Sequence, residues 1–254
     1  VWRNQDDLKL YRAVRVADNK PYQRTRVFHT PYNLRSKVST NRYSIAGYPS
    51  LYLGTSLELC CNEIKADLNK DLIIAAAFKL ERTIEYTNTN IQVIELGVKP
   101  QDFLNIPIDN EGSRRRIPRD LVESTNVQSA YLLWYPLIAA CSFIRTNKND
   151  PFAAEYIIPQ LLMQWVRSEI NSKEDDYDNL IGIRYFSCAS VKASDMGFNY
   201  VFPTSGRQKS YELPYCAVLT KAFRLTNPVY IHEYDNISAC EWKLSKSNNY
   251  DHIH

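Results

Sequence analysis

Short apolar runs separated by polar turns divide most of the chain into strand-like segments. Runs that are rich in β-branched and aromatic side chains are typical of β-strands. Eight segments fit this description: Lys9–Val14, Ser50–Gly54, Leu72–Lys79, Ile91–Leu96, Leu180–Ser187, Phe198–Phe202, Tyr215–Leu219 and Val229–Tyr234.

The clearest helical pattern begins after Thr55, which forms a capping box with Glu58. Apolar side chains then recur at helical spacing, at Leu57, Cys60, Cys61 and Ile64. The pattern therefore predicts a short helix directly after the strand Ser50–Gly54.

Two longer helices are predicted at Val127–Ile144 and Phe152–Ile170, where Pro136 and Pro159 should kink or split them. Strands outnumber helices and do not alternate strictly with them, which favours an α+β fold over a doubly wound sheet. A chain of 254 residues can bury one continuous core. We therefore expect a single domain, residues 1–254, with a helical insertion at about residues 120–170.

The net charge of +3 is too small to indicate general nucleic-acid binding, but the charge is uneven. Between Arg12 and Arg42 there are eight Lys or Arg residues and one acidic residue, Asp18. This density suggests one localised anionic ligand such as a phosphate, and a solvated basic face is the plain alternative. Interleaved aromatic residues also leave open a single-stranded nucleic-acid platform.

The sequence lacks the signature motifs of several functional classes. Only 7 glycines occur, and neither a Gly-rich phosphate loop nor a metalloprotease or hydrolase motif is present. The 4 histidines have no Cys or His neighbours at ligand spacing, so no metal site is predicted.

The 6 cysteines form no C-x-x-C pair and suit buried core positions, which favours a reduced, cytoplasmic protein. The start of the sequence lacks the apolar run of a signal peptide. The uncharged stretch Ser124–Ile144 approaches the length of a membrane span, but its polar residues favour a buried helix. No membrane association is therefore expected.

The segment His29–Ile64 carries the strongest functional pattern. A basic residue precedes the turn formed by Gly47 and Pro49, an aromatic residue lies in the next strand, and a carboxylate lies on the predicted helix. These groups would surround one strand end. They are the parts needed to hold a dinucleotide while its glycosidic bond breaks.

Here the chain resembles the RES-domain family, bacterial NAD-consuming toxins named for an Arg, a Glu and a Ser. The family spacing is met by Arg42, Gly47, Pro49, Tyr52 and Glu63. Further similar segments are Leu10–Arg12 (LYR), Glu155–Leu162 (EYIIPQLL, found in longer members), Gly182–Ser187 (GIRYFS) and Asn199–Pro203 (NYVFP). The resemblance covers about residues 10–203, and the C-terminal extension 204–254 lies outside it.

The resemblance implies a fold akin to the ADP-ribosyltransferase toxins, with a split β core and NAD⁺ in the cleft. It implies cleavage of the nicotinamide–ribosyl bond, by phosphorolysis in some relatives, with NAD⁺ as substrate, inorganic phosphate as a possible co-substrate and no permanent cofactor. Many members are neutralised by a cognate antitoxin that covers the cleft. Transfer of ADP-ribose to a macromolecule stays open as an alternative, as does oligomerisation.

The chemistry assigns Arg42, supported by Arg12, to the diphosphate, because a guanidinium can grip two oxygens. Glu63 is the expected catalytic group, because a carboxylate can stabilise the cationic ribose or orient the attacking oxygen. Without the family spacing, the arginines would be interpreted as surface ion pairs and Glu63 as an exposed helix carboxylate.

Tyr52 could stack on the nicotinamide ring, although core packing is its rival role. Ser187 is expected to donate to a phosphate or ribose oxygen, and no histidine is placed to make it a nucleophile. The resemblance also implies Asn199, in the strand after the Ser motif, as a substrate-binding residue. Three weaker candidates rest on the resemblance to longer members alone: His29, Glu155 and Gln160.

Overall fold

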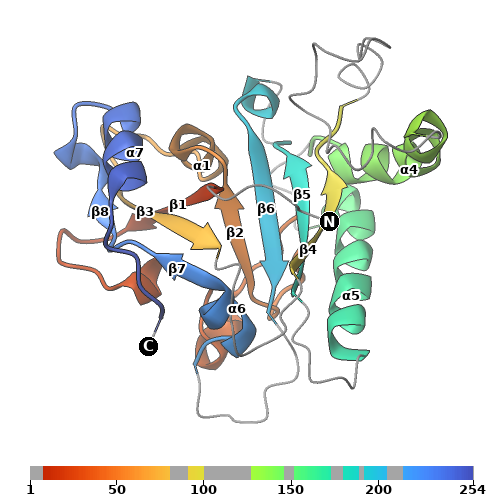
Figure 1. Ribbon diagram of the computed structural model, residues 1–254, viewed down its shortest axis with the longest axis horizontal. Coiled ribbons are helices and arrows are strands. Elements are labelled where there is room, and N and C mark those ends of the chain that lie inside the picture. Colours follow the sequence, from red (N-terminus) through yellow and green to blue (C-terminus); the bar gives the residue numbers. More distant parts are fainter. Residues whose placement is uncertain are drawn as a thin grey trace.

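The computed structural model describes residues 8–80, 91–99, 127–145, 152–172, 180–188, 192–204 and 214–253. They form an α+β fold around one mixed sheet, as predicted (Figure 1). The strand order is β4-β5-β6-β2-β1-β3-β7, with β8 also paired to β3, and only β4 and β5 run parallel. The strands are β1 (Lys9–Val16), β2 (Ser50–Gly54), β3 (Leu72–Leu80), β4 (Ile91–Leu96), β5 (Leu180–Phe186), β6 (Phe198–Pro203), β7 (Phe223–Leu225) and β8 (Val229–Tyr230).

The junction between β1 and β2 divides this sheet into two halves. β1 pairs with β3 at all eight of its positions, and β2 pairs with β6 at all five. In contrast, β1 and β2 pair in register only at Tyr11 and Gly54. Arg12 is the next residue of β1, so it lies where the two halves of the sheet separate.

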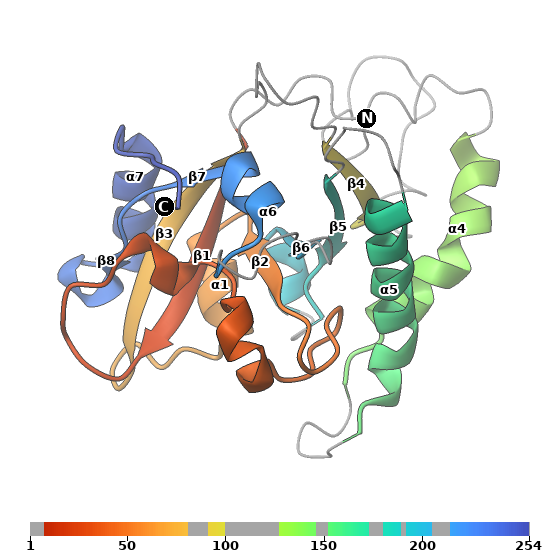
Figure 2. The same cartoon turned by 90° about the horizontal axis from the view of Figure 1, so that it is seen from below.

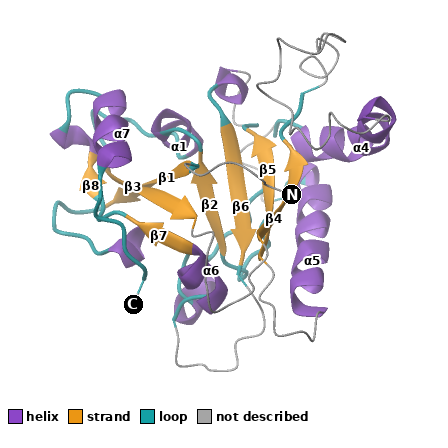
Figure 3. Cartoon of the chain, in the orientation of Figure 1, coloured by secondary structure: helices purple, strands orange, loops and turns teal. Residues whose placement is uncertain are grey.

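Helices cover both faces of the sheet (Figures 2 and 3). α1 and α7 pack with β1 and β3 in one apolar cluster, whereas α4 and α5 pack with β4, β5 and β6 in another. α6 belongs to a third cluster, which fills the other face beneath β1, β2 and β6. The helices are α1 (Leu57–Glu63), α4 (Val127–Ser142), α5 (Ile157–Ser172), α6 (Ala217–Ala222) and α7 (Ile237–Lys246).

Near the C-terminus, one predicted strand is wrong and another is too long. The segment Tyr215–Leu219 enters α6, because a short apolar run has no period that separates a strand from a buried helix. The strand predicted at Val229–Tyr234 ends at Tyr230 and continues as a 3-10 helix over Ile231–Glu233.

The N-cap of α1 is also corrected. Ser56, not Thr55, accepts the backbone N–H of Leu59, at 3.2 Å. The Thr55 hydroxyl instead accepts the backbone N–H of Phe198, at 2.9 Å, and so joins β2 to β6. Both Thr55 and Ser56 are of a residue type that can cap a helix. The hydrogen bond from Phe198, which is distant in sequence, engages Thr55, and Ser56 is the cap.

The helical insertion consists of α4 and α5, which lie between β4 and β5 in the chain. α4 runs through Pro136 without being split, and Pro159 lies in the first turn of α5, where proline is tolerated. Residues 120–126 and 146–151 of the predicted insertion lie outside the described residues.

The C-terminal extension is part of the same sheet. Residues 214–253 supply β7 and β8, which pair with β3, and the helices α6 and α7. Neither β7 nor α7 was predicted. The segment called an extension from the sequence therefore completes the half of the sheet that contains β1.

None of the six cysteines forms a disulfide, and all six are buried, as predicted for core residues. Among the described residues, no helix is long and apolar enough to span a membrane.

Candidate functional site

Three predicted site residues meet at the C-terminal end of α1. Glu63 Oε1 accepts hydrogen bonds from Ser187 Oγ at 2.6 Å and from Asn199 Nδ2 at 2.5 Å. Ser187 directly follows β5 and Asn199 lies on β6, and both are buried while Glu63 is exposed. We call these three residues the Glu63 cluster. Buried donors therefore hold the carboxylate of a residue that is exposed as a whole.

Close packing between α1 and β2 brings the cluster together. Gly54 pairs in register with Asn199, and a Cβ on Gly54 would lie 2.7 Å from Cys60 Sγ. Glycine is therefore required there for α1 to approach the strand. The start of α1 is held by a second acceptor, since Glu241 Oε2 of α7 receives the backbone N–H of Leu57 at 2.6 Å.

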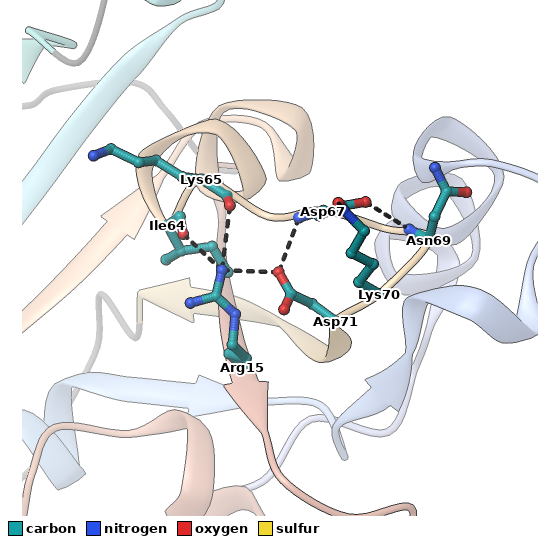
Figure 4. A network of polar contacts seen from close by, with 7 residues as sticks. All are labelled: Arg15, Ile64, Lys65, Asp67, Asn69, Lys70 and Asp71. Carbon is teal, nitrogen blue, oxygen red and sulfur yellow. Dashed lines mark hydrogen bonds and ion pairs between the residues drawn. The ribbon is translucent and has the colours of Figure 1, made fainter.

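The residues after α1 are held by Arg15 of β1 (Figure 4). Arg15 Nη2 donates to the carbonyl oxygens of Ile64 at 3.3 Å and Lys65 at 3.2 Å, and to Asp71 Oδ2 at 2.8 Å. Lys65 has a positive φ of 50°, so the chain turns sharply just after Glu63. Polar contacts from distant strands and helices thus hold α1 at both ends.

Arg12 carries a buried nitrogen, Nη1, that has no hydrogen-bond partner among the described residues. Burial lowers the pKa of its guanidinium to about 10, and the nearby charge of Arg26 acts in the same direction. The charge of Arg12 opposes the rise in pKa that burial causes at Tyr52 and Cys60, so Arg12 lies within electrostatic reach of both. A partly buried cation whose buried nitrogen lacks a hydrogen-bond partner among the described residues suits an anionic ligand.

Arg42 is bound to carbonyl groups of the helical insertion. Its Nη1 and Nη2 donate to the carbonyl oxygens of Cys141 at 3.0 Å and Phe143 at 2.8 Å, and its guanidinium lies 5.2 Å from the Tyr156 ring centroid. A cation is favourable at the C-terminal end of α4. Gln160 adds a bond from Nε2 to the carbonyl oxygen of Asn41 at 2.9 Å. The insertion therefore positions Arg42.

Buried Tyr185 lies within electrostatic reach of both Arg42 and Glu63. Burial raises the pKa of its hydroxyl well above the usual value, Glu63 and Tyr52 raise it further, and Arg42 lowers it. Glu63 and Arg42 therefore act on the same side chain with opposite signs. The Tyr52 hydroxyl hydrogen-bonds Ser44 Oγ at 2.7 Å, and its pKa is raised by burial.

The structure does not favour His29 as a substrate-binding residue. Its side chain is completely buried, its Nε2 accepts the backbone N–H of Cys216 at 3.0 Å, and its Nδ1 donates to the Thr30 carbonyl at 2.8 Å. Burial lowers the pKa of His29 to about 4, with Arg12 acting in the same direction. A neutral His29 that uses both ring nitrogens internally has a structural role.

The basic segment is less uniform than its sequence suggested. Arg15 pairs with Asp71, Lys20 with Asp18 and Arg24 with Asp251. Those three cations are used within the protein, which weakens the interpretation of the segment as a continuous nucleic-acid platform. Arg12 keeps the features of an anion-binding residue.

Glu155, the other weak candidate, lies in the 3-10 helix Ala154–Tyr156 just before α5. Among the described residues, no three His, Cys, Asp or Glu side chains gather as metal ligands would. Sequence reasoning missed Glu241 and the helix that carries it. The available signal was the Asn236 cap followed by Ile237, Cys240 and Leu244 at helical spacing.

Comparison with known proteins gives one curated relative. The chain is 29% identical over 228 residues to a protein of Bacillus subtilis (strain 168) named "Putative toxin YopC". The match covers 85% of this chain and 45% of the relative, so the chain spans less than half of the relative's length. No family model matches the chain, and no solved structure matches it. The comparison therefore relates this chain to a protein named as a toxin.

Proposed function

We propose that this chain is a toxin that consumes NAD⁺ by cleaving the bond between nicotinamide and ribose. One observation carries the proposal: the exposed Glu63 carboxylate is held by the buried donors Ser187 and Asn199. The toxin role is supported by the name of the curated relative. The RES-domain resemblance and the split between β1 and β2 support a fold akin to the ADP-ribosyltransferase toxins.

In the proposed reaction, the carbon–nitrogen bond breaks and its electron pair leaves with neutral nicotinamide. The anomeric carbon becomes cationic and then bonds to an oxygen of phosphate or water, and water would release a proton to solvent. Both cluster donors bind Oε1 of Glu63, and no described residue donates to Oε2. Oε2 would therefore stabilise the cationic ribose or orient the attacking oxygen.

The remaining residues would hold the substrate. Arg12 would donate its unsatisfied Nη1 to the diphosphate, and Arg42 would contribute N–H groups that the Cys141 and Phe143 carbonyls leave unused. Tyr52 would flank the nicotinamide ring. Ser187 already donates to Glu63, so it would position the carboxylate rather than attack the substrate.

The test compares two exposed glutamates of the same helix, Glu63 and Glu58. Purified protein is incubated with NAD⁺, with and without phosphate, and nicotinamide is measured by chromatography. We expect Glu63→Gln to lower the rate by about 100-fold or more, whereas Glu58→Gln should retain it. Equal rates for wild type and Glu63→Gln, or no nicotinamide from the wild type, would contradict the proposal.

The same reaction identifies the acceptor. ADP-ribose indicates hydrolysis, ADP-ribose 1″-phosphate indicates phosphorolysis, and label from NAD⁺ incorporated into macromolecules indicates ADP-ribosyl transfer. Expression in a bacterial host then tests the toxin role. Wild type should arrest growth, Glu63→Gln should not, and a co-expressed antitoxin would restore growth.

A further inference from the structure

Arg167 of α5 is a nearly buried cation that has no acidic partner among the described residues. The residue is 9% exposed, and burial lowers the pKa of its guanidinium. Its contacts are a hydrogen bond from Nη2 to Thr204 Oγ1 at 3.3 Å and the Tyr48 ring, whose centroid lies 4.7 Å from Cζ. Burying a charge without a counter-charge is costly, so a cation in this setting is typical of a site that an anion completes.

Hydrogen-bond donors on the same side of α5 are left unused. Arg167 Nε and Nη1 donate to no described residue, and neither atom is fully buried. Gln164 Nε2 is buried and also has no hydrogen-bond partner among the described residues. Gln164 and Arg167 are three positions apart on α5, so their side chains lie on the same side of the helix. This side of α5 therefore offers a positive charge together with donors that the described residues do not use.

The turn before β2 and the end of β6 complete the surroundings of the guanidinium. Gly47 has a positive φ of 81°, which allows the turn that places Tyr48 beside α5. The Tyr48 ring is 45% exposed. Thr204 Oγ1 donates to the carbonyl oxygen of Pro49 at 3.0 Å and accepts the bond from Arg167. Three segments that are distant in sequence thus hold this arginine in one position.

We propose that Arg167 and Gln164 form an anion site that binds a phosphate group, which we call the α5 anion site. A phosphate presents acceptor oxygens to both side chains, and a guanidinium can bind two of these oxygens at once. The exposed ring of Tyr48 would also accept a stacked base, so the site suits either free phosphate or the phosphate of a nucleotide. The inference does not depend on the proposed reaction, which assigns the diphosphate to Arg12 of β1.

Isothermal titration calorimetry with inorganic phosphate, at constant ionic strength, tests the α5 anion site. Arg167→Met should weaken binding by about 10-fold or more, because charge-assisted hydrogen bonds are lost. Gln164→Leu keeps the net charge and should weaken binding by about 5-fold, as the loss of one neutral donor does. Lys70→Met is the matched control. It removes one positive charge from a side chain that is 82% exposed, and it should leave binding unchanged.

Two further titrations separate the α5 anion site from other sources of binding. The Arg12→Met variant removes the cation assigned to the diphosphate, and phosphate binding at Arg167 should persist in it. AMP identifies where the phosphate comes from. Equal affinities for AMP and phosphate would indicate that the phosphate group alone is recognised, whereas tighter binding of AMP would indicate a nucleotide.

Folding of each variant is checked by circular dichroism. Gln164→Leu removes no hydrogen bond made by Nε2, so it tests the site even if Arg167→Met is unstable. A wild type that binds neither phosphate nor AMP would overturn the proposal. So would binding that Arg12→Met abolishes, or folded Arg167→Met and Gln164→Leu variants that bind as tightly as the wild type.

Discussion

Helices α1 and α4 make opposite use of their apolar residues. α1 has seven residues, yet it buries Leu57, Leu59 and both cysteines and is held at each end by distant polar groups. α4 has 16 residues and no charge, but Leu132 and Leu133 face solvent, and Arg42 binds carbonyls near its C-terminal end. Apolar content therefore does not determine burial. α1, which carries the proposed catalytic carboxylate, is held by buried apolar side chains and by polar contacts at both ends.

The largest expected effect is the difference in stability between two leucine-to-alanine substitutions, one in α1 and one in α4. Leu57→Ala should lower the free energy of unfolding by about 3 kcal/mol, because it leaves a cavity at a completely buried position. Leu133→Ala should change it by less than about 0.5 kcal/mol, because the Leu133 side chain faces solvent. Denaturant unfolding measures both. Similar losses in the two variants would show that the contrast between the helices is wrong.

Acid should destabilise the core beside Arg12, where His29 is held neutral. The folded pKa of His29 is about 4 and the ordinary value is 6.5, so the unfolded chain binds more protons between these values. The free energy of unfolding that neutral His29 contributes is fully present above pH 6.5 and is lost as the pH falls toward 4. From pH 7 to pH 5 the loss should be about 2 kcal/mol.

The control for the pH experiment is His29→Gln, which removes the titrating ring. The variant is expected to be less stable at pH 7, because the hydrogen bonds of both ring nitrogens are altered. Its stability should also fall less steeply between pH 7 and pH 5. An unchanged slope would assign the acid sensitivity to other groups.

The contact between α7 and α1 should have a smaller effect. Glu241→Ala removes the acceptor for the Leu57 N–H and should cost about 1 kcal/mol of stability, as the loss of a helix cap does. Glu241→Gln keeps an acceptor oxygen and should cost less. If α7 positions Glu63 through α1, the alanine variant should lower kcat for nicotinamide release more than it raises KM.

The smallest expected effect is local to α4. Arg42→Ala removes the donors to the Cys141 and Phe143 carbonyls, so the last turn of α4 should open more often. Hydrogen exchange should become several-fold faster there and stay unchanged in α1. Faster exchange in both helices would mean that Arg42 supports the whole fold.

Local sequence signals predicted the elements that hold the site. Six of the eight predicted strands, α1, α4 and α5 were found near their expected positions, because their periodicity and length distinguish strands from helices. α6 was mistaken for a strand, since Tyr215–Leu219 is too short to show a period. α7 was overlooked although Asn236 caps it, because the cap was not considered together with the apolar spacing that follows.

By itself, the sequence determined which residues are candidates for chemistry, since the spacing of Arg42, Tyr52 and Glu63 depends only on neighbouring turns, strands and helices. The tertiary structure decided what each one contacts. It placed Ser187 and Asn199 on one oxygen of Glu63, bound Arg42 to α4 and enclosed His29. The reason is physical: local propensities act over a few residues, whereas these contacts join groups that lie 99 to 187 positions apart.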